Sequence, residues 1–213
     1  DALTVDGVAR QLNGLPRGAA PVAAEWVTAF ADVHDSLLYW SVYAWAPDFT
    51  GWCLDYGTYP DQKTAHFTLR HPPRPLSRVH RGVAREALIV TGLLALFDEL
   101  FARHWERTDG LAMPIVATAV DSGHERELVF AAIRRSTHGA RLLPSKGVGV
   151  TAVKKPFSEY IKHPGDQVGD HWRMPRPESR SDLRVLTIDT NHWKTFGAAR
   201  LRQPLGQPGC VTF

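Results

Sequence analysis

The sequence has few cysteines and no long apolar run, and each shortage excludes a class of protein. Its 213 residues include only Cys53 and Cys210, so it is not a disulfide-stapled secreted scaffold. The longest apolar run, 87–97, is well short of the roughly 18 residues that a membrane span needs. The first 18 residues also lack the basic-then-apolar order of a secretory signal. We therefore expect an intracellular protein that makes no membrane contact.

The chain also lacks a strong excess of charge of either sign. It has 25 Lys and Arg against 22 Asp and Glu, and 44% of its residues are hydrophobic, which excludes wholesale disorder, collagen and coiled coil. A chain of this length buries roughly 70 to 75% of its unfolded surface, enough for one core without staples. The Gly-, Pro- and Ala-rich start predicts a linker or arm over 1–21, and 22–213 is expected to form one domain.

Apolar alternation and turn residues predict an antiparallel meander in the first third of the chain. Its strands are expected at 26–31, 37–46 and 50–56. Several prolines make 59–76 a surface connection, and apolar residues at helical spacing predict a long helix over 79–105.

Alternating strands and helices are expected next, followed by a polar stretch. The order is a strand at 114–120, an amphipathic helix at 125–135 and a short strand at 141–143 that ends at Pro144. The proline-interrupted stretch 154–181 predicts a long loop or flap. A final pair of strands is expected at 183–189 and 195–201. The whole order predicts a mixed α/β protein with one sheet and helices on at least one face.

Two of the predicted apolar strands end in aspartate, at Asp32 and Asp121. If the strands are neighbours, both carboxylates project from one sheet edge, where α/β proteins usually bind ligands. Paired carboxylates repel unless cations neutralise them, and Mg²⁺ prefers oxygen ligands together with phosphate. The pattern predicts a two-ion phosphodiester site. The alternative for each aspartate alone is a cap at the strand end, and Ser122 and Gly123 make Asp121 suitable as an N-cap.

Other motifs for catalysis are missing from the sequence. It contains no phosphate loop of the Gly-x-x-x-x-Gly-Lys type, no His-Glu-x-x-His pair and no nucleophile elbow. His34 and His124 lie beside the two aspartates and are expected to be ordinary turn residues. Basic residues recur in two groups that either follow a phosphate backbone or form solvated surface. The groups are Arg70, Arg74, Arg78, Arg81 and Arg85, and Lys154, Lys155, Lys162, Arg173, Arg176 and Arg180.

Several blocks of the sequence resemble, in order, the nuclease domain of lambda-type large terminase subunits of tailed phages. The blocks are WVTAFADVHD at 26–35, the strand-rich stretch 45–56, VDSGH at 120–124, LPSKG at 143–147 and LTIDTNHWK at 186–194. Each block is short, and the resemblance rests on their common order. The resemblance covers roughly residues 15 to 213.

The resemblance implies an RNase H-like mixed sheet with flanking helices. It also implies a Mg²⁺- or Mn²⁺-dependent endonuclease that cuts concatemeric double-stranded DNA and binds two metal ions. It assigns metal-binding and catalytic roles to Asp32 and Asp121. The family's third carboxylate lies late in the domain, so it is either Asp189 or a residue beyond Phe213. Implied partners are double-stranded DNA, the terminase ATPase domain, the small terminase subunit and the portal. The implied location is the cytoplasm of a bacterial host.

Departures from the family pattern keep two other functions open. His34 and the Phe30-Ala31 pair stand where Gln and Gly-Val are expected, so a catalytically inactive DNA-binding or motor-interaction module is the first alternative. An actin-like nucleotide-binding fold also places an aspartate after its first strand, although its glycine-rich phosphate turns are not evident here.

Overall fold

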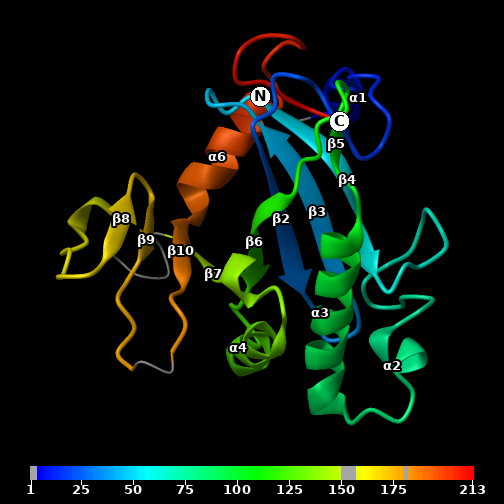
Figure 1. The fold of residues 1–213 in the computed structure, drawn as a ribbon, viewed down its shortest axis with the longest axis vertical. Coiled ribbons are helices and arrows are strands. Elements are labelled where there is room, and N and C mark those ends of the chain that lie inside the picture. Colours follow the sequence, from blue (N-terminus) through cyan, green and yellow to red (C-terminus); the bar gives the residue numbers. More distant parts are fainter. Residues whose placement is uncertain (1–3, 150–156, 180–181) are drawn as a thin grey trace.

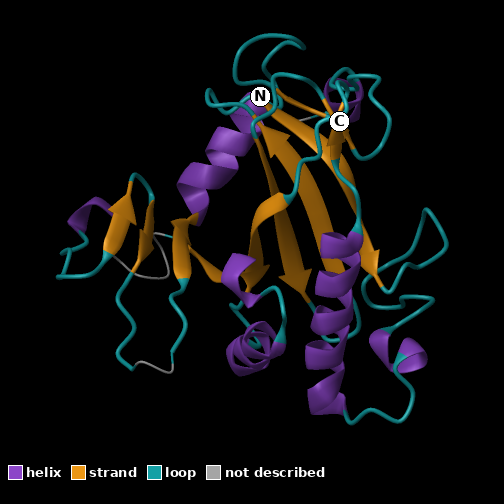
Figure 2. Ribbon diagram, viewed as in Figure 1, coloured by secondary structure: helices purple, strands orange, loops and turns teal. Residues whose placement is uncertain are grey.

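The main feature of the computed structural model, which describes residues 4–149, 157–179 and 182–213, is a large mixed sheet (Figures 1 and 2). Within these residues the sheet has nine strands in the order β11-β4-β3-β2-β6-β7-β10-β9-β8. Four central neighbours, β2, β6, β7 and β10, run parallel to one another. Helices α3 and α4 cover one face. The predicted mixed α/β architecture is confirmed, and it is consistent with an RNase H-like fold.

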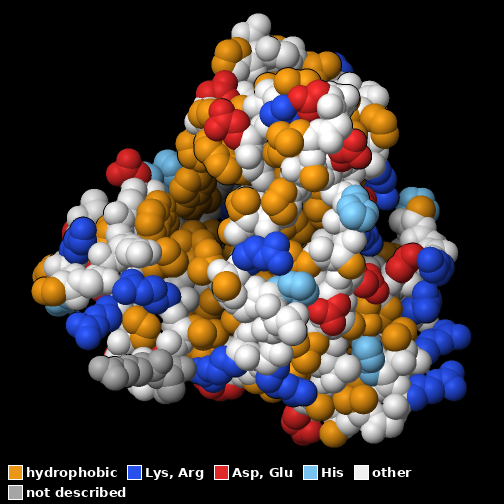
Figure 3. Space-filling model, in the orientation of Figure 1, with side chains coloured by type: hydrophobic (Ala, Val, Ile, Leu, Met, Phe, Trp, Pro, Cys, Tyr) orange, Lys and Arg blue, Asp and Glu red, His pale blue; other side chains and the backbone are white. Residues whose placement is uncertain are grey.

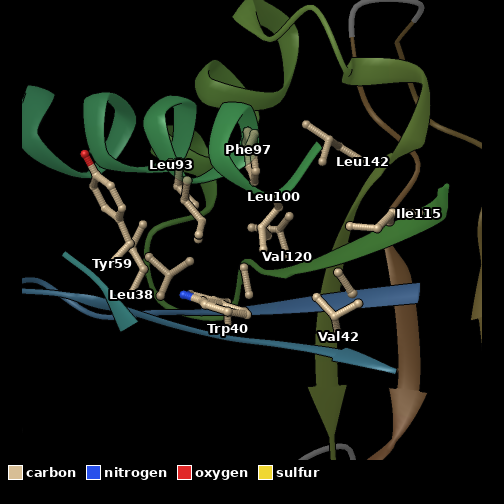
Figure 4. Packing of buried hydrophobic residues seen from close by; sticks show 14 of the residues in the cluster. Leu38, Trp40, Val42, Tyr59, Leu93, Phe97, Leu100, Ile115, Val120 and Leu142 are labelled. Atoms are coloured by element: carbon tan, nitrogen blue, oxygen red, sulfur yellow. The ribbon is translucent and has the colours of Figure 1, made fainter. Parts of the chain in front are cut away.

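The predicted meander is confirmed as three antiparallel strands, β2 (Trp26–Val33), β3 (Leu38–Trp45) and β4 (Gly51–Tyr59). Alternate residues of β3 are buried, as expected for a strand with one covered face. The long helix is also confirmed, as α3 (Arg85–Ala102), preceded by the short α2 (Leu76–Val79). Figure 4 shows the core between α3 and the sheet, formed by Leu38, Trp40, Val42, Leu93, Phe97 and Leu100 among others.

Two parallel strands and a helix follow the meander. They are β6 (Ile115–Asp121), α4 (Arg126–Arg135) and, after the single turn η1 (Gly139–Arg141), β7 (Leu142–Val148). The sequence predicts a strand at 141–143 that ends at Pro144. This prediction is wrong, because the strand, β7, continues to Val148. Pro144 pairs only with β6, since β7 begins to pair with β10 at Ser145, so the N–H that proline lacks is not needed for a second neighbouring strand.

The predicted final strand pair is wrong in its second half. Residues 186–189 form β10 (Leu186–Asp189), but the chain then enters a helix, α6 (Thr190–Arg200). The cause is local: Asp189 Oδ1 accepts hydrogen bonds from the backbone N–H groups of Asn191 (3.0 Å) and His192 (3.2 Å). A side chain that caps the first turn in this way stabilises a helix by about 1 kcal/mol.

The stretch 154–181 is only partly the loop that the sequence predicts. Its residues 154–156 and 180–181, with Lys154, Lys155 and Arg180, lie outside the described residues. The described part contains the single turn η2 (Phe157–Glu159) and an antiparallel hairpin, β8 (Gln167–Gly169) and β9 (Trp172–Met174), which extends the sheet beyond β10. The sequence did not predict β8 and β9, because each has only three residues and neither shows apolar alternation.

Asp166 organises the turns around this hairpin. Its carboxylate accepts hydrogen bonds from the backbone N–H groups of Arg176 (2.8 Å) and His163 (2.9 Å) and from the Tyr160 hydroxyl (2.8 Å). These bonds favour the charged form and lower the pKa of Asp166 to about 2. The ionised carboxylate therefore stabilises the turns around the hairpin.

We expect acid to remove the contribution of Asp166 to stability. Because the folded-state pKa lies below the ordinary 3.8, this contribution is complete above about pH 5 and is lost as the pH falls through 3.8 towards 2. Asp166→Asn should therefore be less stable than the unmodified protein at pH 6, and the difference should shrink near pH 2. Urea unfolding of both proteins across this range measures it. A difference that does not change with pH would contradict the prediction.

The segment that precedes the meander contacts the C-terminal part of the chain. It contains α1 (Val5–Ala9) and β1 (Ala19–Ala20), which pairs with β5 (Glu106–Arg107), while β11 (Val211–Thr212) pairs with β4. The Gln11 side-chain amide donates to the carbonyls of Leu201 (3.1 Å) and Gln203 (2.7 Å). The boundary at residue 21 stays a prediction. Among the described residues, no helix combines the length and the apolar character needed to cross a membrane.

Candidate active site

The sheet brings the ends of β2 and β6 together. The two strands are parallel neighbours, and the last pair in their register is Ala31 with Val120. Asp32 and Asp121 are the next residues in each strand. In-register residues of neighbouring parallel strands lie about 4.8 Å apart and point to the same face. Ala31 and Val120 are buried in the core, so alternation directs both carboxylates to the face away from α3.

Asp32 is held by its neighbours on the meander. Its Oδ2 lies 3.2 Å from His34 Nε2, and its side chain is 44% exposed. The His34 ring meets Tyr39 edge-on, with 5.7 Å between the ring centroids, and Tyr39 is the partner of Asp32 in β3. The Asp32 carboxylate is thus oriented by a histidine but remains accessible to a ligand. His34 lies in the turn after β2, as expected, and it also contacts Asp32 there.

Asp121 is positioned by the turn that follows β6. Its Oδ1 accepts a hydrogen bond from the backbone N–H of Gly123 at 3.2 Å. The Ser122 backbone N–H and hydroxyl both donate to the Ser145 carbonyl at 2.8 Å, which attaches this turn to β7. The N-cap of α4 is Glu125, so Asp121 does not cap that helix.

A second group of possible ligands lies at the same end of the sheet. Ligand atoms of Asp35, His124 and Glu125 all lie within 4.8 Å of one another. Asp35 is three residues beyond Asp32, and His124 is three residues beyond Asp121. Sequence reasoning missed Asp35 and Glu125 as ligands; the available signal was that each lies in the turn after a strand-end aspartate.

The structure does not bring Asp189 to this pair. Asp121 of β6 pairs with Ser145 of β7. Asp189 belongs to β10, on the other side of β7, and pairs with Val148, which is three residues after Ser145. At roughly 3.3 Å per residue, the offset along the strand is about 10 Å. The role of Asp189 as the third ligand therefore stays a prediction, and its observed contacts are with the first turn of α6 and with His171 of the β8–β9 hairpin.

The environment of Asp189 stabilises its charged form. Burial acts to raise the pKa, but the hydrogen bonds from His192, His171 and Asn191 outweigh it, so the pKa lies below its ordinary value. His171 Nδ1 lies 3.5 Å from Asp189 Oδ2. The carboxylate is thus engaged on both oxygens.

Two substitutions should separate helix capping from any metal-binding role of Asp189. Asparagine caps helices as well as aspartate does, so Asp189→Asn should change the free energy of unfolding by less than about 0.5 kcal/mol. Asp189→Ala should cost about 1 kcal/mol because it leaves two N–H groups unpaired. Chemical denaturation measures both values, and equal losses would contradict the capping role. A loss of cleavage by the stable Asp189→Asn protein would identify a ligand.

The chemistry of the paired carboxylates suits a hard divalent cation. Both offer oxygen donors from rigid strand ends, and Asp32 is partly open to solvent. The ion pairs of the described residues join neither carboxylate to a lysine or arginine that would neutralise it. The adjacent Asp35, His124 and Glu125 supply further oxygen and nitrogen donors. The residues present thus fit Mg²⁺ or Mn²⁺.

Comparison with known proteins gives one result. A family described as "Terminase large subunit gpA, endonuclease domain" matches residues 1–213, the whole chain. No curated protein and no solved structure matches the chain.

Proposed function

The chain belongs to the endonuclease-domain family of the terminase large subunit gpA, and we propose that it hydrolyses phosphodiester bonds of double-stranded phage DNA with divalent ions held by Asp32 and Asp121. The observation that supports the proposal is the parallel register of β2 and β6, whose last pair, Ala31 with Val120, lies one residue before each aspartate. Family membership supports endonuclease activity, and nucleases of this type generally use divalent metals.

Each residue at the proposed site has a distinct task. Asp32 and Asp121 would hold the ions, and His34 orients the Asp32 carboxylate. Two ions, when bound, supply activation of a water molecule and stabilisation of the leaving oxygen. Gly123 and Ser122 fix the turn that carries Asp121, because a side chain at position 123 would place its Cβ 3.3 Å from Asp121 Oδ1. Asp189 enters the proposal as the third ligand that the sequence predicts, to be tested by Asp189→Asn.

The family also suggests the setting in which the protein works. Terminase large subunits act on DNA together with packaging machinery. We propose that the substrate is concatemeric DNA in the cytoplasm of a bacterial host, and that the partners are the terminase ATPase domain, the small terminase subunit and the portal.

A cleavage assay on purified protein tests the proposal. We expect duplex DNA to be cut in Mn²⁺ or Mg²⁺ and to remain intact in EDTA. Cutting that persists in EDTA would contradict metal-assisted hydrolysis. Salt-sensitive DNA binding with no cleavage in either metal would instead support the alternative of an inactive DNA-binding module.

A further inference from the structure

The segment 60–85, which we call the arginine lobe, concentrates positive charge. It contains six Lys and Arg residues and one Asp, a formal charge of +5, whereas the whole chain has +3. The single carboxylate, Asp61, is already paired with Lys63 at 2.6 Å. The other five cations are Arg70, Arg74, Arg78, Arg81 and Arg85. Figure 3 shows Lys and Arg side chains gathered along the edge of the molecule where α2 lies.

The arginine lobe is anchored to the domain although it has little secondary structure. The Gln62 side chain, 4% exposed, donates to the carbonyls of Pro60 (2.6 Å) and Arg74 (2.9 Å) and accepts from the Arg74 N–H (2.8 Å). Leu76 is fully buried and packs so closely on α3 that a Cβ at Gly92 would lie 2.6 Å from it. These contacts fix the backbone from which the arginines extend.

The anchoring places the arginine lobe beside the proposed catalytic pair. The Leu76 N–H donates to the Ser36 carbonyl at 2.7 Å, in the turn just after β2. Phe67 stacks on Tyr39, with 6.3 Å between the ring centroids, and Tyr39 is the strand partner of Asp32. In Figure 1 the arrowhead of β2 and helix α2 lie at the same end of the sheet.

The arginines have donors to offer an anionic partner. Arg70 and Arg81 are exposed, and within the described part of the chain neither has a hydrogen bond or ion pair. Arg74 and Arg78 each donate to a backbone carbonyl of the lobe, of Asp61 and Pro73 respectively, at 2.9 Å. Arg85 lies 3.9 Å from Asp35. Guanidinium groups match phosphate oxygens in geometry and charge.

We propose that the arginine lobe binds the phosphate backbone of duplex DNA and so positions a phosphodiester at Asp32 and Asp121. This inference rests on the proposed function for its substrate. Three observations support it: the +5 charge of 60–85, the exposed and unpartnered Arg70 and Arg81, and the contacts of the lobe with Tyr39 and Ser36. The lobe would supply binding energy and position, while the aspartates supply the chemistry.

Binding of a short DNA duplex in EDTA, measured by fluorescence anisotropy from 50 to 200 mM salt, tests the lobe without cleavage. We expect the Arg70→Gln, Arg81→Gln double variant to bind at least about tenfold more weakly and to lower the slope of log K against log salt by up to about 2. Arg10→Gln with Arg202→Gln, an equal loss of charge at exposed sites outside the lobe, should change neither. Arg70→Lys with Arg81→Lys should largely restore the slope.

The outcomes separate the lobe from the catalytic proposal. If the glutamine double variant binds with unchanged affinity and slope, or if the control pair weakens binding equally, the lobe proposal is overturned even where the unmodified protein cuts DNA. If only the glutamine double variant loses binding and the unmodified protein does not cut DNA in either metal, the lobe proposal is supported and the nuclease proposal is rejected. Circular dichroism confirms that each variant is folded.

Discussion

Asp32→Asn and Asp121→Asn should each lower Mn²⁺-dependent DNA cleavage by at least about 100-fold. Divalent ions contribute several kcal/mol of charge stabilisation, and removing one anionic ligand weakens their binding and misplaces them. Asparagine keeps the size of each side chain and the ability of residue 121 to accept the Gly123 N–H bond. The loss should therefore appear in cleavage rate and not in thermal stability.

The matched control is Asp6→Asn, an exposed aspartate of α1. It removes the same charge and should leave cleavage within about twofold, since surface changes away from a site have little effect. The double variant Asp32→Asn, Asp121→Asn should be no worse than the more damaged single variant, because the two residues act as a unit. Full cleavage by both single variants would reject the assignment.

Leu93→Ala should lower the free energy of unfolding by about 2 to 5 kcal/mol. Leu93 is 0% exposed on α3 and faces Leu38 across the core, so the truncation removes buried methyl groups and leaves a cavity (Figure 4). Because α3 covers the strands that carry the aspartates, this core sets the precision of the site. Denaturant unfolding gives the value.

Leu12→Ala is the control for this change, because Leu12 is 65% exposed. The same truncation there should cost less than about 0.5 kcal/mol. Equal losses for the two leucines would show that α3 does not seal the core as described.

The sequence predicts the central sheet well because its signals are strong and local. Alternation in β3 and apolar runs that end at Asp32 and Asp121 locate the strands at the centre of the sheet. That the two aspartates become neighbours depends on the pairing of β2 with β6, which no local pattern encodes. The resemblance to terminase nucleases supplied that connection.

Other parts of the structure depend on contacts that are distant in sequence or on side-chain capping. The Asp189 cap turned an expected strand into α6, although an aspartate before a polar turn was visible in the sequence. Glu125 and Asp35 approach each other only because two separate turns meet at one sheet end. Similarly, the arginine lobe was visible as charge, but its place beside Asp32 follows from Phe67 and Leu76.

Anomalous scattering from crystals soaked in Mn²⁺ tests the central claim most directly. The account predicts manganese coordinated by carboxylate oxygens of both Asp32 and Asp121. Manganese bound elsewhere, for example only by Asp35, His124 and Glu125, with the two strand-end aspartates left free, would contradict it.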